Sequence, residues 1–598
     1  MLWFVRDFDL LGLLLRAVSF ALEALAFGSL FFLLFAARPA RLAADTQARL
    51  RRIASWFALA LAVTQVVLLA TTSAELMGTA GLGFREVVTA AFFISGSIFA
   101  AAALVLFVLL RATARLWPAV VAAFVALSAS VSLSHAASRM DHRSLLLMLT
   151  AGHHLGMAAW LGALPFLLIA INFAGDDAVN RAMARRFSTM AVAAAATLVL
   201  AGAGLAWFYA GSWHGMYGTA YGILLSAKIV LTALTLTLGA ANFVSLRETD
   251  GQRRPLLFRL RRFSEVELGL GFTVLIAAAS LTAQSPSVDE SPENILSAHG
   301  VVQRMEWRWP GFHTPALAQL APPTPLSVAV PEATFTGGSA SDANDRAWSE
   351  YNHHWAGLIV FAAGLLALVA RLPGQRWAQH WPLLFLGLAV FIVLRADPEC
   401  WPLGPRPFWA SFTAPDVLEH RLFATLAAAF ALFEWGVRTG RLPWPRARFV
   451  FPALCAAGGA LLLTHTHALG EGTDEVFADL SHTPMAVLGA AAGWSRWLEL
   501  RLDPGLDPGP GTGDASAENA RPRRIAAWIW PVCLVLEAIA GLKQVSLLFD
   551  GAVDRFLRAR DERAVARRLQ EGDGVVLAGP CEGKPARPGL GGRAERGF

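Results

Sequence analysis

The 598-residue chain has little cysteine and few charged residues, and each scarcity excludes a class of protein. Charged residues make up 16% of the chain and hydrophobic residues 55%, which excludes an ordinary soluble domain. The four cysteines, Cys400, Cys455, Cys533 and Cys581, are far apart and form no CxxC or other zinc-type spacing. A thiolate metal site is therefore not expected, and nothing in the spacing calls for a disulfide.

Motifs for enzyme chemistry are also missing. The sequence has no evident nucleophile–base pairing, phosphate-cradling loop or nucleotide-binding motif, so neither catalysis nor direct drive by ATP is expected.

The N-terminus lacks the pattern of a cleaved signal peptide, because the apolar run after Arg6 is too long and no small-residue cleavage site follows it. Residues 10–36 are better interpreted as a first retained span, with Glu23 unusually placed inside it.

Apolar windows of roughly 20 residues recur along the chain, which predicts an all-α, polytopic membrane helical bundle surrounded by lipid. Helices are expected because an open strand in lipid would leave backbone donors unpaired. Fourteen candidate spans lie near 10–36, 53–74, 87–110, 117–134, 144–173, 188–209, 219–245, 264–283, 353–371, 381–395, 416–436, 449–466, 482–499 and 525–549.

Arginine is concentrated in every second connecting loop, for example in residues 38–52, 181–186 and 247–262. This pattern places those loops in the cytoplasm and the N-terminus in the periplasm of a bacterial inner membrane. The net charge of +6 is therefore interpreted as a topology signal, and no nucleic-acid partner is expected. The tail after Asp550 is also rich in arginine, although fourteen spans would place it outside, so its side is left open.

A long irregular segment divides the predicted bundle into two parts. Residues 284–350 are rich in Pro, Ser, Ala and Gly and are interpreted as an extracytoplasmic linker. This linker separates an eight-span domain, 1–283, from a six-span C-terminal domain, 351–549. Residues 550–598 are expected to form a disordered tail.

Histidine is almost confined to the outer side of this predicted topology. Thirteen of the fourteen histidines fall in outer loops or in the outer parts of spans, and only His380 falls on the cytoplasmic side. Imidazole is the commonest metal ligand among side chains, and imidazole with thioether suits copper. The candidate ligands on the outer side are His135, Met140, His142, His153, His154, Met157, His214, Met216, His353, His354, His420, His465, His467 and His482.

His153 and His154 lie inside the span at 144–173, and Met157 follows about one helical turn later. Ionisable groups at membrane depth are costly and by default indicate a functional site. The alternatives are that both histidines hydrogen-bond a neighbouring helix and that the methionine fills a packing gap. His465 and His467, followed by His482 at a helix start, form a possible three-imidazole site for copper(II) or zinc, with a solvated loop pair as the alternative.

Several short elements follow one another between the fourth and the eighth predicted span: Ser134-His135-Ala136, His154-x5-Trp160-Leu161-Gly162, Phe187-Ser188, Gly202, Gly204, the run 218–228, Asn242, Glu265, Glu267 and the run 283–286. In their order and spacing, these elements resemble the copper-resistance D (CopD) membrane family. The similarity is good over about residues 130–286 and looser over the first four spans. The first span departs from the family pattern, because it contains Glu23 and no His or Met ligand set.

The resemblance implies an inner-membrane protein that moves or handles copper, often beside a small periplasmic carrier of the copper-resistance C type. Our primary hypothesis is a permease that admits copper, as Cu(I) or Cu(II), from the periplasm. Outer His and Met groups would capture the ion, and His153, His154 and Met157 would pass it into the bundle. Two alternatives remain: a factor that delivers copper to a respiratory oxidase, and a redox protein that binds haem b through paired histidines.

Overall fold

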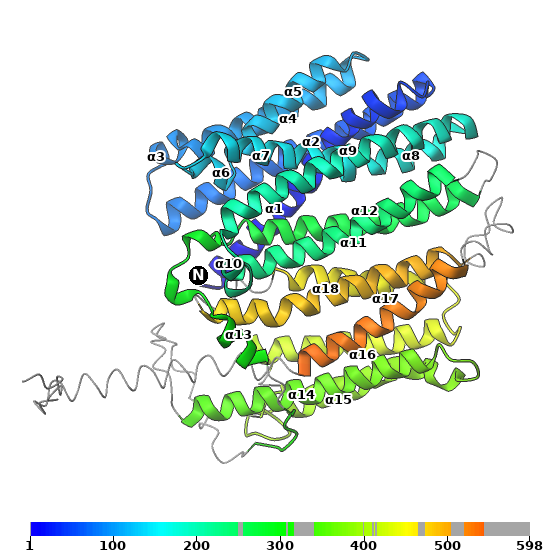
Figure 1. Cartoon of the computed structure of the whole chain (residues 1–598). Helices are drawn as coiled ribbons and strands as arrows, with labels where there is room; N and C mark the ends of the chain where they lie inside the picture. Colours follow the sequence, from blue (N-terminus) through cyan, green and yellow to red (C-terminus); the bar gives the residue numbers. More distant parts are fainter. Residues whose placement is uncertain are drawn as a thin grey trace, which may run out of the picture. The chain divides into compact units, whose positions relative to one another are not determined.

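The structure is a computed structural model that describes residues 2–248, 255–305, 309–315, 340–398, 400–409, 412, 415–464, 473–503 and 520–542. Every extended regular element among these residues is a helix, and the helices lie side by side as a bundle (Figure 1). Ten of the described helices are long and apolar enough to cross a membrane, judged by length and composition. The prediction of an all-α, polytopic bundle is therefore confirmed.

The first part of the chain contains most of the membrane-length helices. Its elements are α1 (Leu2–Phe31), η1 (Phe32–Ala37), α2 (Ala44–Thr79), α3 (Phe84–Thr89), α4 (Ala91–Ala112), α5 (Trp117–Ser132), α6 (His135–Ser138), α7 (Arg143–Met157), η2 (Ala158–Gly162), α8 (Leu164–Ala174), α9 (Asp177–Ala210), α10 (Trp213–Gly218), α11 (Ala220–Glu248) and α12 (Pro255–Leu281). The span predicted at 144–173 is thus one continuous path made of α7, the π-helical turn η2 and α8.

The later part of the chain is also helical. Its elements are α13 (Ala298–Met305), α14 (Ala340–Val369), η6 (Arg376–Leu383), α15 (Leu384–Arg395), α16 (Pro415–Arg438), η8 (Pro445–Phe449), α17 (Val450–Leu462), α18 (Thr473–Arg501) and a last helix, Ala520–Leu542. Each of the fourteen predicted spans therefore contains a helix among its described residues. The four outside the group of ten are the short helices α5 and α17, and α16 and α18, which carry several charged residues.

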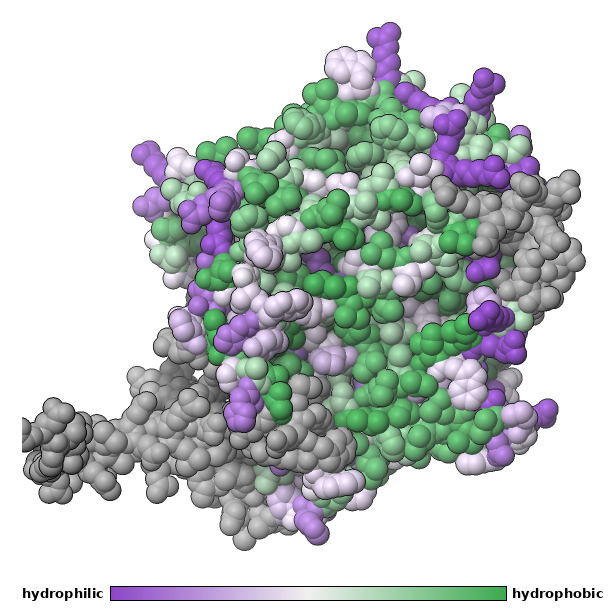
Figure 2. Space-filling model, in the orientation of Figure 1, coloured by the Kyte–Doolittle hydropathy of each residue, from purple (hydrophilic) through white to green (hydrophobic). Residues whose placement is uncertain are grey.

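The described surface has the distribution of polarity that lipid requires. Hydrophobic side chains cover the middle of the helices, and hydrophilic side chains gather toward the helix ends (Figure 2). Large apolar side chains such as Leu200 and Trp207 of α9 are exposed on the outside of the bundle. A helix that is apolar on all sides is typical of a membrane span, because its outer face contacts hydrocarbon instead of water.

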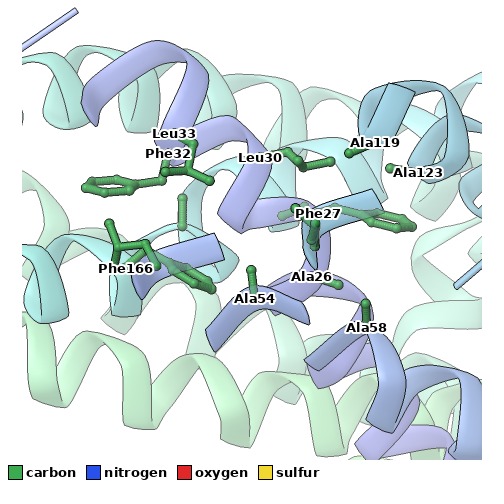
Figure 3. Packing of buried hydrophobic residues seen from close by; sticks show 14 of the residues in the cluster. Ala26, Phe27, Leu30, Phe32, Leu33, Ala54, Ala58, Ala119, Ala123 and Phe166 are labelled. Atoms are coloured by element: carbon green, nitrogen blue, oxygen red, sulfur yellow. The ribbon is translucent and has the colours of Figure 1, made fainter. Parts of the chain in front are cut away.

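The largest group of buried hydrophobic residues joins α1, α2, α5 and α8 with parts of α4 and α9. Alanines such as Ala54 of α2 and Ala123 of α5 leave room beside the rings of Phe27 and Phe166 (Figure 3). Small residues therefore set the helix separation, and the rings fill the remaining space.

Three glycines bring the α7–η2 segment into backbone contact with helices on two sides. A Cβ added to Gly162 would lie 1.8 Å from the carbonyl oxygen of Ala24, and one added to Gly28 would lie 2.1 Å from the carbonyl carbon of Gly162. On the other side, a Cβ on Gly156 would lie 2.7 Å from the carbonyl oxygen of Ala194 in α9. The close approach of α1 and of α9 to the α7–η2 segment depends on the absence of side chains at these positions.

The predicted linker contains more structure than its composition indicates. Residues 287–289 and 292–294 form 3₁₀ turns, and residues 298–305 form the helix α13. Ser287 donates from its hydroxyl to the carbonyl oxygen of Gly215 at 3.0 Å, which attaches this segment to α10. Residues 316–339 lie outside the described residues.

Helices from the two predicted domains are in contact. Arg501 of α18 donates to Glu265 of α12 at 2.6 and 2.8 Å. One hydrophobic cluster also contains Leu231 of α11, Leu270 of α12 and Ala490 of α18. The proposed division into 1–283 and 351–549 stays a prediction, and the tail at 550–598 lies outside the described residues.

Candidate functional site

An acidic residue and a histidine are paired inside the bundle. Glu23 of α1 is 1% exposed, and its Oε1 atom lies 2.9 Å from Nδ1 of His154 in α7. Ser130 of α5 donates from its hydroxyl to the other carboxylate oxygen of Glu23 at 2.8 Å. The ring of Phe20 meets the His154 ring edge-on, with 6.2 Å between centroids. Three helices therefore fix the orientation of one imidazole.

The neighbouring residue His153 is held by α9. Its Nδ1 atom lies 3.2 Å from the carbonyl oxygen of Leu198, and Gly202 leaves room for the ring. A carbonyl oxygen can only accept a hydrogen bond, so Nδ1 of His153 carries the proton, and Nε2 of the neutral ring keeps a lone pair. An ionised Glu23 imposes the same tautomer on His154. Both Nε2 atoms are then suited to act as metal ligands.

One of the two histidines has a charged partner. Glu23, in contact with His154, supplies a negative charge that favours a cation. The carboxylate therefore offsets part of the cost of placing a positive ion at this depth.

Met157 lies on the same helix but in hydrophobic surroundings. It is 7% exposed and belongs to a cluster that includes Ala24, Trp160 and Leu198. Immediately after it, Ala158–Gly162 forms the π-helical turn η2. Such turns are rare in helices and are frequent at functional sites.

The histidines of the first part that are predicted to lie on the outer side contact the backbone or aromatic rings. Nε2 of His135 lies 3.1 Å from the carbonyl oxygen of Thr282, and Nε2 of His214 lies 2.9 Å from that of Leu296. The His142 ring packs on Phe208, with 5.2 Å between centroids. Of the two outer methionines, Met140 is 91% exposed, and Met216 packs against the hydrophobic cluster of α11 and α12.

The candidate ligands of the later part are held separately. His354 is 3% exposed, with Nδ1 3.0 Å from the carbonyl oxygen of Gly311, whereas His353 is exposed. Nδ1 of His420 lies 2.6 Å from Oδ1 of Asp397.

His482 is the only described member of the predicted three-imidazole site, and its Nδ1 atom lies 2.8 Å from the hydroxyl oxygen of Ser481. His465 and His467 lie outside the described residues.

Within the part of the chain that the structure describes, no group of three or more His, Cys, Asp or Glu side chains could hold a metal ion. The fourteen ligands therefore stay a prediction as a set. The structure pairs His154 with Glu23, and it holds His153 separately against Leu198 of α9. Sequence reasoning missed Glu23 as a partner, although an acidic residue in an apolar span was a signal for it.

A second buried polar cluster lies on the other side of η2. Trp160 donates from Nε1 to Oε1 of Glu267 at 2.7 Å, and Asn242 of α11 donates from Nδ2 to Oε2 at 3.1 Å. Glu267 is 3% exposed, and Asn242 also donates to the hydroxyl oxygen of Ser264 at 3.3 Å. The sequence shows these residues as separate elements, and the fold joins them.

Comparison with known families concerns the helices that carry these contacts. Residues 181–281, which cover most of α9 and all of α11 and α12, match the family described as Copper resistance protein D. This segment belongs to the copper resistance protein D family. The predicted resemblance is therefore confirmed over residues 181–281, and copper resistance and copper handling at a membrane are the functions that the family implies. No curated protein and no solved structure matches the chain.

The CopD segment contributes residues to the surroundings of both polar clusters. Leu198, whose carbonyl oxygen binds His153, lies in it, as do Asn242 and Glu267. His153, His154 and Trp160 precede the segment and pack against it through α7 and η2. The two polar clusters thus lie where the CopD segment meets the helices before it.

Proposed function

We propose that the protein admits copper from the periplasm across the bacterial inner membrane, with His153 and His154 as the ligands that receive the ion inside the bundle. The observation that carries this proposal is the contact of both histidines with other helices through Nδ1. His153 binds α9 of the CopD segment, and His154 binds Glu23 of α1. Both Nε2 atoms then remain as lone-pair donors, and neutral imidazole is a good ligand for copper.

Glu23 has the role of a positioning residue in this proposal. Metal-binding histidines commonly donate their other ring N–H to a carboxylate, which fixes the tautomer and raises the basicity of the ligand nitrogen. The contact between Glu23 and His154 has this arrangement. The same carboxylate balances part of the charge of the copper ion.

The exposed outer groups supply the first capture of the ion. Met140 and His142 precede α7 in the chain, and His214 lies on α10 near the end of α9. The predicted topology places all three on the periplasmic side, where a carrier of the copper-resistance C type would deliver copper. Import is the direction that follows when these groups act before His153 and His154.

The test is copper uptake by cells or membrane vesicles that carry the double variant His153→Ala, His154→Ala. Uptake should fall to the level of vesicles without the protein. The matched control is His299→Ala, which removes an exposed imidazole of α13 that is not among the candidate ligands and should leave the uptake unchanged. Unchanged uptake by a well-expressed double variant contradicts the route.

Two further measurements separate the alternatives. If the protein loads copper into a respiratory oxidase, deletion should lower oxidase activity while total cell copper stays normal. If it binds haem b, the purified protein should show a Soret band. The proposal predicts reduced cell copper on deletion and a preparation without that band.

A further inference from the structure

Glu267 lies near the middle of α12 and is almost completely buried. Both carboxylate oxygens accept hydrogen bonds, Oε1 from Trp160 and Oε2 from Asn242. Both donors are electrically neutral. Glu267 thus has hydrogen-bond partners but no balancing charge from them.

The charged and titratable groups on the surrounding helices are engaged elsewhere or lie apart from Glu267. On α12 itself, Arg262 and Glu265 pair with each other, and Glu265 also pairs with Arg501 of α18. Other groups on these helices are Glu23 on α1, His153 and His154 on α7, three arginines of α9 (Arg181, Arg185 and Arg186), Lys228 on α11, and Arg496 and Glu499 on α18. The same helices also carry Arg16, Asp177, Tyr209, Tyr221, Arg259, Arg261, Asp479 and His482. In the described part of the chain, Glu267 forms no ion pair with any of them.

A cavity of about 340 Å³ opens beside this carboxyl group, between η2, α8, α9, α11 and α12. Its walls are mainly apolar, with Leu167 and Phe187 among them, and Ser188, Asn242 and Ser264 add polar groups. Gly239 keeps the space next to the carboxyl group open, because a Cβ there would lie 3.1 Å from Oε1. Polar groups in a space of this size can support water, the medium through which protons move.

An ionised carboxylate in a medium of low dielectric constant needs a balancing positive charge. Both oxygens of Glu267 already accept hydrogen bonds, and among the described residues no group of three His, Cys, Asp or Glu side chains could hold a metal ion, so a proton is the ion that fits the cavity. We propose that Glu267 binds and releases a proton through this cavity, and that this proton is the ion coupled to copper movement. The coupling part of this inference rests on the proposed function, whereas proton binding does not.

Trp160 links the proton-binding group to the histidines. It lies in η2, directly after the helix that carries His153 and His154, and its indole N–H donates to Glu267. Protonation turns one carboxylate oxygen from an acceptor into a donor, which competes with the N–H groups of Trp160 and Asn242. Proton binding therefore acts on the segment that holds the copper ligands.

The first experiment treats the purified full-length protein in lipid nanodiscs with dicyclohexylcarbodiimide. This hydrophobic reagent adds to a protonated carboxyl group in apolar surroundings and leaves a stable acylurea. Mass spectrometry should find the label on Glu267, with labelling that decreases as pH rises. Glu267→Gln should lose it, whereas the control Glu75→Gln, an exposed carboxyl group on α2, should keep it.

Infrared difference spectra between low and high pH provide a readout that does not depend on access of a reagent to the carboxyl group. The band of a protonated carboxyl group should disappear in Glu267→Gln and persist in Trp160→Phe, which keeps an aromatic ring but removes the N–H donor. Proton binding at Glu267 is overturned if the wild-type protein shows neither the label nor a band that Glu267→Gln removes.

The second experiment measures copper uptake by proteoliposomes with and without an imposed pH gradient. The gradient should change wild-type uptake and should have no effect on Glu267→Gln, while the variant still binds copper. A gradient effect that survives in Glu267→Gln overturns the coupling. If no copper enters with any variant but Glu267 is still labelled, the proposed function fails and proton binding stands.

Discussion

Glu23 and His154 are 2.9 Å apart although 131 positions separate them in the chain. The pair joins the first helix to the helix that carries both intramembrane histidines, and Ser130 adds a third helix. An acidic residue in an apolar span is expensive, and here the cost is met by two specific contacts. The position of the first helix therefore determines the orientation and the tautomer of the His154 ring.

Replacement of Glu23 by Ala should weaken both stability and copper binding. His154 would lose the acceptor for its ring N–H, and Ser130 would lose its partner, so we expect a destabilisation of about 1–3 kcal/mol. Thermal unfolding of the purified protein and competition with a copper chelator measure the two effects. Ser130→Ala, which keeps the carboxylate on His154, should lower stability slightly and leave copper affinity nearly unchanged. Equal behaviour of Glu23→Ala and wild type would contradict the role of the carboxylate.

Replacement of Gly162 by Ala should disrupt the packing of α1 on η2. The added methyl group would lie 1.8 Å from a backbone oxygen, which cannot move as a side chain can. The expected cost is about 1–3 kcal/mol or more, seen as a lower yield of folded protein and a lower unfolding temperature. The matched control is Gly12→Ala, because a Cβ at Gly12 has nothing within 4 Å. If both variants are equally stable, the close crossing is not required.

The ion pair between Glu265 and Arg501 should couple α12 to α18. Both side chains are about one-fifth exposed, and the guanidinium donates to both carboxylate oxygens. A double-mutant cycle with Glu265→Gln and Arg501→Gln should give a coupling energy of roughly 1 kcal/mol. Unfolding of the full chain in detergent is the measurement, and additive effects of the two changes would show that the contact adds no stability.

The predicted orientation can be tested by labelling from one side of the membrane. Ser138 and Arg186 are both exposed, near opposite ends of the α7–α9 region. In a background without native cysteines, Ser138→Cys should react with a membrane-impermeant maleimide in intact spheroplasts. Arg186→Cys should react only after the membrane is opened. The reverse pattern would place the histidine-rich side in the cytosol and end the import proposal.

The helices could be predicted from the sequence because length and apolar composition define a membrane span without knowledge of its neighbours. Their rotations could not, since a span such as Ala91–Ala112 is apolar on every side and shows no face that must be buried. Rotation decides which polar side chains meet. For this reason His135 and His214, predicted as metal ligands, were not expected to bind backbone carbonyl oxygens.

The two polar clusters differ in how far the sequence indicated them. His153 and His154 stand out as ionisable residues at membrane depth, so their importance could be predicted and their partners could not. Trp160, Asn242 and Glu267 were visible as separate family elements, far apart in the chain. Only the packing of α11 and α12 against η2 shows that they share hydrogen bonds.

The glycines that seat α7 and η2 against α1 and α9 also restrict how the molecule can move. Gly162 lies against the backbone of α1, and Gly156 lies against the backbone of α9. A translation or rotation of this segment would therefore bring its main chain into collision with theirs. An opening that lets an ion through is therefore expected from the helices that approach this segment less closely, while the main chain that carries His153 and His154 keeps its position.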